Sequence, residues 1–227
     1  EHPGWVSRHV AELQHESYSS WPPTIWPYAT RGMPANPYAT RLTVLNHGLW
    51  SGTPDLDAET QLRVGTPVYR LIEQTIPQGQ FFPMSGMNLG FRRVLTPAMY
   101  FGLMGTVQGK DTGYHRYGDI WAGLFAKRIA DHFGWVVRSG RPTVRHERAS
   151  DPQVNLVKEA TAKAATEWLW RAVAEVPLTA PTVTGGYRQF ADRLTLPYDN
   201  TLTLPYEPYW TDFRRAMHVW ADLFEED

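Results

Sequence analysis

The sequence predicts an α/β fold that continues into a helical C-terminal extension. Two observations lead to this prediction. Strand-like and helix-like segments alternate from about residue 42 to residue 149, which is typical of an α/β domain. From residue 150 onwards the apolar residues recur at helical spacing. We therefore expect residues 1–149 to form the later part of an α/β domain and residues 150–227 to form a helical extension.

The first predicted elements are a strand, a short helix and a hairpin. Residues 42–50 (LTVLNHGLW) predict a buried strand that leads into a turn at Gly48. Asp57 is placed to cap a short helix after this strand. Residues 79–95 predict a strand, a tight turn at Ser85-Gly86 and a second strand, and their glycines let the backbone approach another group closely.

The clearest helix is predicted over residues 119–133. Its apolar residues form one stripe, which consists of Trp121, Leu124, Phe125, Ile129 and Phe133. Asp119 is placed to cap the start of this helix, and Gly134 follows its end. We expect residues 135–138 (WVVR) to form the next strand.

Three helices are predicted in the C-terminal extension. Ser150-Asp151-Pro152 is a strong helix start, because proline suits the first turn, and we expect this helix to end near Val176. Its expected inner face consists of Val154, Val157, Ala164, Trp168 and Ala172. Residues 184–194 and 207–227 supply the other two helices. We expect the aromatic stripe of the last one to pack on the core, with an oligomer interface as the alternative. The stripe consists of Trp210, Phe213, Met217, Trp220 and Phe224.

Composition limits the possible classes of function. The formal net charge is -1 and no basic tail is present, so we do not expect nucleic acid as a partner. No stretch approaches the roughly 18 apolar residues of a membrane span, and no signal-peptide pattern opens the chain, so we expect a cytoplasmic protein. Cysteine is absent, which excludes disulfides and thiolate metal sites. The 10 Trp and 11 Tyr suit ring-lined pockets for sugars or nucleotides, although an aromatic core explains them slightly better.

Few side chains indicate chemistry on their own. The D-x-D pair at residues 55–57 could chelate a divalent cation, but a helix cap is the simpler account. Asp119 could act as a base or bind sugar hydroxyls if it faces a cleft. His146 lies in a polar loop, where it could complete a metal site with acidic residues. Arg31 and Arg41 could hold a diphosphate through paired donors.

Four segments taken together are more informative than these single residues. They are VLNHGLWSGTPDLDAETQ, FFPMSGMNLGFRRVLTPAMYFGLMG, RYGDIWAG and HERASDPQVNL. In this order they resemble the reversibly glycosylated polypeptides, also called UDP-arabinopyranose mutases. The resemblance runs from about Tyr28 to the final helix, and the aromatic turn, the GMN step and the D-I-W-A-G helix start are highly specific in combination.

The resemblance implies a glycosyltransferase-A-like fold, the fold of nucleotide-diphospho-sugar transferases, that acts on UDP-sugars with Mn²⁺ or Mg²⁺. Family members interconvert UDP-arabinopyranose and UDP-arabinofuranose and glycosylate themselves reversibly on an arginine. The arginine lies in an R-G-Y-P segment that corresponds here to residues 31–34 (RGMP), so Arg31 is an expected catalytic residue. Asp119 would be a second one that positions or deprotonates a hydroxyl, and His146 would help to complete the metal or phosphate site.

The resemblance also implies a set of substrate-binding residues. These are Ser85, Gly86, Asn88, Trp121 and Arg41. Residues 85–88 would form the turn that faces the donor sugar. Residues 97–105 (PAMYFGLMG) would line the sugar end of the cleft or pack the sheet against the helix at 119–133. We expect Asn88 in the site and most of the Met and Phe side chains in the core.

Several positions depart from the family pattern. A second family arginine meets Tyr38 in the gapless register, the paired aspartates become Gly118-Asp119, and a cysteine before G-M-N is Ser85. The metal-binding run of aspartates belongs upstream of this chain. We expect a UDP-sugar enzyme of the mutase type that associates with itself or a related subunit. The alternatives are a glycosyltransferase that uses an external acceptor and a non-catalytic scaffold subunit.

Overall fold

The structure is a computed structural model that describes residues 41–52, 57–64, 74–147, 150–195 and 207–224. The described elements, in chain order, are β1 (Thr43–Gly52), α2 (Ala58–Val64), β2 (Gln74–Ile76), β3 (Leu89–Phe91), the 3-10 helix η1 (Arg93–Ala98), β4 (Thr106–Val107), β5 (Lys110–Asp111), the 3-10 helix η2 (Tyr114–Tyr117), α3 (Gly118–His132), β6 (Val136–His146), α4 (Pro152–Glu175), α5 (Val183–Arg193) and α6 (Glu207–Asp222).

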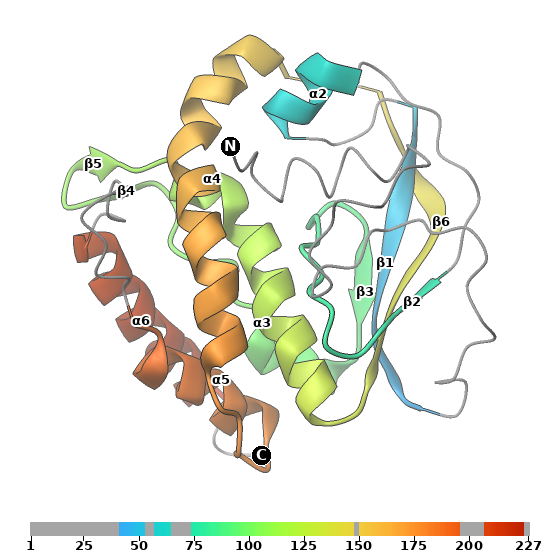
Figure 1. The fold of residues 1–227 in the computed structure, drawn as a ribbon, viewed down its shortest axis with the longest axis vertical. Coiled ribbons are helices and arrows are strands. Elements are labelled where there is room, and N and C mark those ends of the chain that lie inside the picture. Colours follow the sequence, from blue (N-terminus) through green and yellow to red (C-terminus); the bar gives the residue numbers. More distant parts are fainter. Residues whose placement is uncertain (1–40, 53–56, 65–73, 148–149, 196–206, 225–227) are drawn as a thin grey trace.

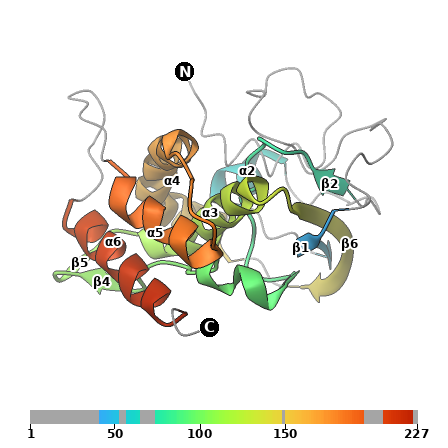
Figure 2. The same cartoon turned by 90° about the horizontal axis from the view of Figure 1, so that it is seen from below.

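The described elements form layers around α3 (Figures 1 and 2). A mixed sheet with the strand order β2-β6-β1-β3 lies on one side of α3, and α4, α5 and α6 lie on the other side. Strands β4 and β5 form a separate hairpin beside α6. This mixture of sheet and helices confirms the predicted α/β class. In the part of the chain that the structure describes, no helix is long and apolar enough to cross a membrane.

The central strands are longer than the sequence predicted. Strand β1 pairs with β6 in parallel and with β3 in antiparallel. We expected β6 to end at 138, but it continues to His146 because residues 144–146 also pair with β1. A register shift lies between the Gly48 and Trp50 pairs, where β6 carries extra residues. The prediction of a turn at Gly48 was wrong, because this glycine continues the strand.

The predicted hairpin over 79–95 is only partly present. The second strand exists as β3, although η1 replaces its end, and a turn lies at residues 86–87. The prediction placed the first strand too late in the chain. The strand is β2 at 74–76, and residues 82–85 have no regular structure. In contrast, α2 begins as predicted, and the carbonyl oxygen of Asp57 accepts the first helical bond from Gln61 N at 3.0 Å.

Helix α3 agrees with the prediction except at its start. Trp121, Leu124, Phe125 and Ile129 are buried, and Gly134 has a φ of 66°, the left-handed conformation that ends helices. Asp119, which was predicted to cap the helix, lies inside its first turn, because the helix already begins at Gly118.

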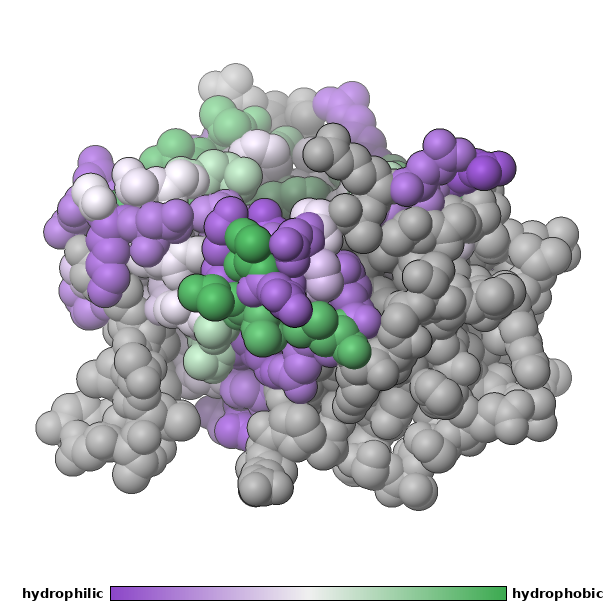
Figure 3. All heavy atoms as spheres, turned by 90° about the horizontal axis from the view of Figure 1, so that it is seen from above, coloured by the Kyte–Doolittle hydropathy of each residue, from purple (hydrophilic) through white to green (hydrophobic). Residues whose placement is uncertain are grey.

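Helix α4 begins as predicted but turns a different face inward. The side chain of Asp151 accepts from Gln153 N at 2.9 Å, which makes it the cap. The predicted inner residues Val154 and Val157 are instead 49% and 78% exposed, whereas Trp168 and Ala172 are partly buried against the core. Because alanine and valine occur on several faces of this helix, the apolar pattern alone did not select the correct one. Seen from the end of the molecule at which α4 begins, apolar side chains form a small group among polar residues (Figure 3).

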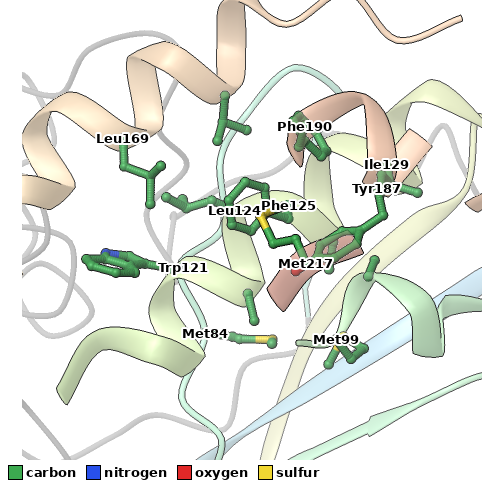
Figure 4. Packing of buried hydrophobic residues seen from close by; sticks show 14 of the residues in the cluster. Met84, Met99, Trp121, Leu124, Phe125, Ile129, Leu169, Tyr187, Phe190 and Met217 are labelled. Atoms are coloured by element: carbon green, nitrogen blue, oxygen red, sulfur yellow. The ribbon is translucent and has the colours of Figure 1, made fainter. Parts of the chain in front are cut away.

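The core gathers side chains from α3 and from the helices that cover it (Figure 4). Phe125 of α3 contacts Phe190 of α5, with ring centroids 5.1 Å apart. Trp210, Phe213 and Met217 of α6 are at most 2% exposed. The aromatic stripe of α6 therefore packs on the core, as predicted.

Candidate functional site

The segment between β2 and β3 is fastened along α3 before it reaches the turn at residues 85–88, which we call the SGMN turn. At its start, Lys127 Nζ donates to the carbonyl oxygen of Pro77 at 2.9 Å, and Asp131 Oδ2 accepts from Gly79 N at 2.9 Å. Lys127 and Asp131 also pair with each other at 2.5 Å. Burial lowers the pKa of Lys127 and raises the pKa of Asp131, and their attraction opposes both shifts.

A glycine in α3 lets the segment approach the helix closely just before the SGMN turn. A β-carbon at Gly123 would lie 2.6 Å from the carbonyl oxygen of Phe82 and 2.7 Å from Met84 N. Such distances are shorter than any van der Waals contact, so only glycine fits without a shift. The glycine of the D-I-W-A-G sequence therefore sets the distance between α3 and the segment that connects β2 to β3.

The SGMN turn is hydrogen bonded to the first turn of α3. Gly86 N donates to Asp119 Oδ2 at 2.7 Å, and Ile120 N donates to Asp119 Oδ1 at 2.9 Å. Both carboxylate oxygens are thus held by backbone donors. Asp119 is only partly buried, and a carboxylate oxygen can accept more than one hydrogen bond.

His47 of β1 supports the SGMN turn from the sheet. Its Nε2 accepts from Ser85 N at 3.3 Å, which assigns the proton of the neutral ring to Nδ1. The ring is fully buried and stands edge-on to Trp50 and Phe82, with centroid distances of 5.7 Å and 5.3 Å. Burial lowers the pKa of His47 to about 3, so the ring is uncharged near neutral pH.

Asn88 closes the SGMN turn against β1. The backbone carbonyl oxygen of Asn88 accepts from Gly48 N at 2.8 Å. A β-carbon at Gly48 would lie 2.2 Å from Asn88 Nδ2, so the Asn88 side chain occupies the space above this glycine. Asn88 remains partly exposed. Its amide and the hydroxyl of Ser85 therefore place donors and acceptors on the same short turn as the carboxylate that Gly86 binds.

The aromatic segment 97–105 holds the SGMN turn from the other side. A β-carbon at Gly86 would lie 3.0 Å from the Phe101 ring, and one at Gly118 would lie 1.9 Å from the Phe101 carbonyl oxygen. Tyr100, the neighbouring residue, stacks on Phe213 of α6 at 6.0 Å. The segment thus joins α6 to the SGMN turn and to the start of α3.

The side chains of the segment 97–105 differ in how deeply they are buried. Phe101 supports the site, Met99 is 7% exposed in the core, and Met104 is 72% exposed. The expectation that most of these Met and Phe groups belong to the core holds for Met99 and for Phe101, which is partly buried against the core, but not for Met104.

Four of the predicted site residues come together in this structure. They are Ser85, Gly86, Asn88 and Asp119. Trp121 does not join them: it is 1% exposed, and its Nε1 donates to Thr166 Oγ1 at 2.7 Å inside the core. The expectation that Trp121 contacts substrate is therefore corrected, because its stripe position and its satisfied N–H make it a packing residue.

Arg41 and His146 lie away from the SGMN turn. Arg41 precedes β1 and donates to Gln78 Oε1 at 3.3 Å, whereas Gly48 is about 23 Å further along the strand at 3.3 Å per residue. His146 pairs with Gly52 at the carboxyl end of β6. Arg31 lies outside the described residues. Within the described ranges, no group of three or more His, Cys, Asp or Glu could hold a metal ion.

Sequence reasoning assigned no role in the site to His47 or Gly48, and it considered the segment 97–105 as a possible wall of the site without singling out Phe101. The N-H-G triplet inside an apolar strand is the signal that could have found the first two, because a buried histidine followed by glycine is unusual in a central strand. Nothing in the local sequence places Phe101 against the SGMN turn, since that contact depends on the path of the chain between β3 and α3.

The match to a known family identifies the class of protein to which this chain belongs. A mixed sheet carries a glycine-containing turn that is hydrogen bonded to the carboxylate at the start of a D-I-W-A-G helix, and residues 6–226 match the reversibly glycosylated polypeptides. The chain belongs to this family.

Particular relatives are UDP-arabinopyranose mutases. The chain is 37% identical over 205 residues to UDP-arabinopyranose mutase 3 of Arabidopsis thaliana, an alignment that covers 86% of this chain and 53% of the relative. It is 39% identical over 200 residues to UDP-arabinopyranose mutase 1 of the same plant, covering 86% and 54%. Over 121 residues it is 50% identical to probable UDP-arabinopyranose mutase 1 of Pisum sativum, covering 52% and 32%. The chain spans about half the length of the first two of these relatives.

Proposed function

We propose that this chain forms the sugar end of a UDP-sugar site in an enzyme of the UDP-arabinopyranose mutase type. The observation that carries the proposal is the hydrogen bond from Gly86 N to Asp119 Oδ2, because it places a fixed carboxylate beside a turn rich in polar groups. The mutase relatives support the choice of UDP-arabinopyranose as substrate. A glycosyltransferase-A-like fold is part of the same proposal, since the mixed sheet with helices is compatible with it.

In this proposal the described residues bind and orient the sugar. Asp119 accepts a hydrogen bond from a hydroxyl group of the sugar. This bond makes the hydroxyl oxygen a better nucleophile when the bond between sugar and UDP breaks. Asn88 and the hydroxyl of Ser85 bind neighbouring hydroxyls. His47 remains neutral and keeps the SGMN turn in position, so the turn does not need to reorganise during the reaction.

Arg31 and a divalent metal belong to the diphosphate end of the proposed site. A guanidinium group stabilises charge that develops on UDP, and Arg31 is also the proposed point of self-glycosylation. Mn²⁺ or Mg²⁺ would supply Lewis-acid stabilisation of the diphosphate. His146 is the candidate ligand in this chain, but the described residues do not form a metal site by themselves.

The direct test is conversion of UDP-arabinopyranose to UDP-arabinofuranose by the complete protein, followed by chromatography of the nucleotides. We expect Asp119→Asn to lower kcat by a factor of about 100 or more, which is the usual effect of losing a positioned acid–base group. Asp212→Asn is the matched control, because Asp212 is a partly buried aspartate on α6 and lies outside the site. Its kcat should change less than about twofold. A fully active Asp119→Asn protein would contradict the proposal, and an inactive but folded wild-type protein would favour a scaffold subunit.

Transfer of the sugar to an external acceptor is a second candidate, and Gly118 favours it. The Phe101 carbonyl oxygen occupies the position where a side chain of residue 118 would begin, so this chain has no room for the second carboxylate of the family pattern. Release of UDP without formation of the furanose, at a rate that rises with an added acceptor, would support transfer. Ring conversion without net release of UDP would support the mutase.

A further inference from the structure

A large cavity lies at the end of α3 that is remote from the SGMN turn. Its volume is about 930 Å³, within the range of small-molecule sites. It opens between η1, the α3–β6 connection, the start of α5 and the end of α6, which meet in the lower part of Figure 1. Asp119 is at the opposite end of the 15-residue helix, about 22 Å away at 1.5 Å per residue. One small molecule therefore cannot contact both places.

Two arginines are among the described residues that line the cavity. Arg93 of η1 and Arg188 of α5 both line it. Arg188 also pairs with Asp222, which holds its guanidinium group in place. Thr182 adds a donor, because its Oγ1 accepts from Gly185 N at 3.0 Å and its own hydroxyl hydrogen remains for another acceptor. Paired guanidinium groups and a hydroxyl suit a phosphate group.

The same cavity has an aromatic wall. Phe133 and Trp135 line it and stack on each other, with centroids 4.8 Å apart and an angle of 24° between the ring planes. Both rings are partly exposed, so their faces or edges are available to a ligand. Phe224 contributes a third ring. Flat apolar surfaces of this kind bind planar rings such as nucleobases.

We propose that this cavity binds a small phosphorylated compound that carries a flat ring, of the nucleoside monophosphate class. The phosphate binds Arg93 and Arg188, and the ring packs on Trp135. The site is separate from the proposed UDP-sugar site and does not depend on it.

The proposal is tested by calorimetric titration of the complete protein with AMP in the presence of saturating UDP. We expect AMP to bind, and adenosine and inorganic phosphate to bind at least about tenfold more weakly, because each makes only part of the contacts. Arg93→Gln and Trp135→Leu should each weaken AMP binding by about tenfold. Arg215→Gln, the same substitution at an exposed arginine of α6 outside this cavity, should leave it unchanged within about twofold.

Three results would overturn the proposal. They are the absence of AMP binding at millimolar concentration, loss of AMP binding when UDP is added, and equal weakening by Arg93→Gln and Arg215→Gln. The second result would assign AMP to the UDP-sugar site, and the third would indicate unspecific attraction of an anion. Thermal unfolding of each variant shows whether it is folded, and Arg93 is suited to the test because its side chain is exposed.

Discussion

His47 makes the folded protein sensitive to acid. Its pKa is about 3 in the folded state and about 6.5 when the chain is unfolded, so between these values the unfolded chain binds the proton and is favoured. Stability from this group is therefore complete above pH 6.5 and is lost as the pH falls. We expect it to fall by about 2 kcal/mol between pH 7 and pH 5. Urea unfolding at both pH values measures the change.

The control for this prediction separates His47 from the other histidines. His47→Gln keeps an acceptor for Ser85 N but cannot be protonated, so its stability should depend on pH less than that of the wild type by about the same 2 kcal/mol. If His47→Gln retains the wild-type pH dependence, the acid sensitivity comes from elsewhere.

Gly118 shows a feature that the sequence alone cannot reveal. In the sequence it resembles a lost aspartate, whereas in the structure it admits the Phe101 carbonyl oxygen to 1.9 Å from the β-carbon position. Alanine normally stabilises a helix relative to glycine. Here we expect Gly118→Ala to destabilise the protein by about 2–3 kcal/mol, because the aromatic segment must move. Gly90→Ala in β3 is the control variant, because nothing lies within 4 Å of the added carbon. Chemical unfolding measures the stability of both variants. Equal effects of the two would disprove the close approach.

At the scale of elements, the sequence predicted where helices begin and end and which faces of α3 and α6 are buried, but not the buried face of α4. The caps at Asp57 and Asp151 and the end of α3 at Gly134 depend on neighbouring residues, so the sequence contains them. The inner face of α4 depends on how it crosses α3. The extension of β6 to His146 depends on pairing with β1, which is distant in the sequence. Contacts between distant segments likewise bring His47 and Phe101 to the site.

The cap of α4 gives a prediction about that helix alone. Asp151 accepts from two backbone N–H groups, of Gln153 and Val154. Asp151→Ala leaves both without this acceptor and should destabilise the protein by about 1 kcal/mol. Asp151→Asn keeps an oxygen in the same place and should remain within a few tenths of a kcal/mol of the wild type. Chemical unfolding of both variants measures the difference. If Asp151→Asn lost as much stability as Asp151→Ala, the effect would come from the charge of Asp151 and not from its acceptor oxygen.

At the scale of the whole molecule, the C-terminal helices and the sheet share one core. A single buried cluster contains residues of β1, α3, α4, α5 and α6. The division predicted near residue 150 therefore does not separate two cores. As a result α6, which contributes no side chain to the SGMN turn, is positioned to influence the site through the aromatic segment 97–105.

Trp220 tests this connection between α6 and the site. Its Nε1 donates to the carbonyl oxygen of Pro97 at 3.1 Å, and its ring stacks on Tyr100 at 5.7 Å. Trp220→Leu removes both contacts, so we expect Phe101 to hold the SGMN turn less firmly. The expected result is a fall in kcat/KM for UDP-arabinopyranose of about tenfold, alongside a loss of about 2 kcal/mol in stability. Val219→Ala, at a 58% exposed neighbour, should change neither. A destabilised Trp220→Leu protein with unchanged kcat/KM would show that α6 supports the fold without positioning the site.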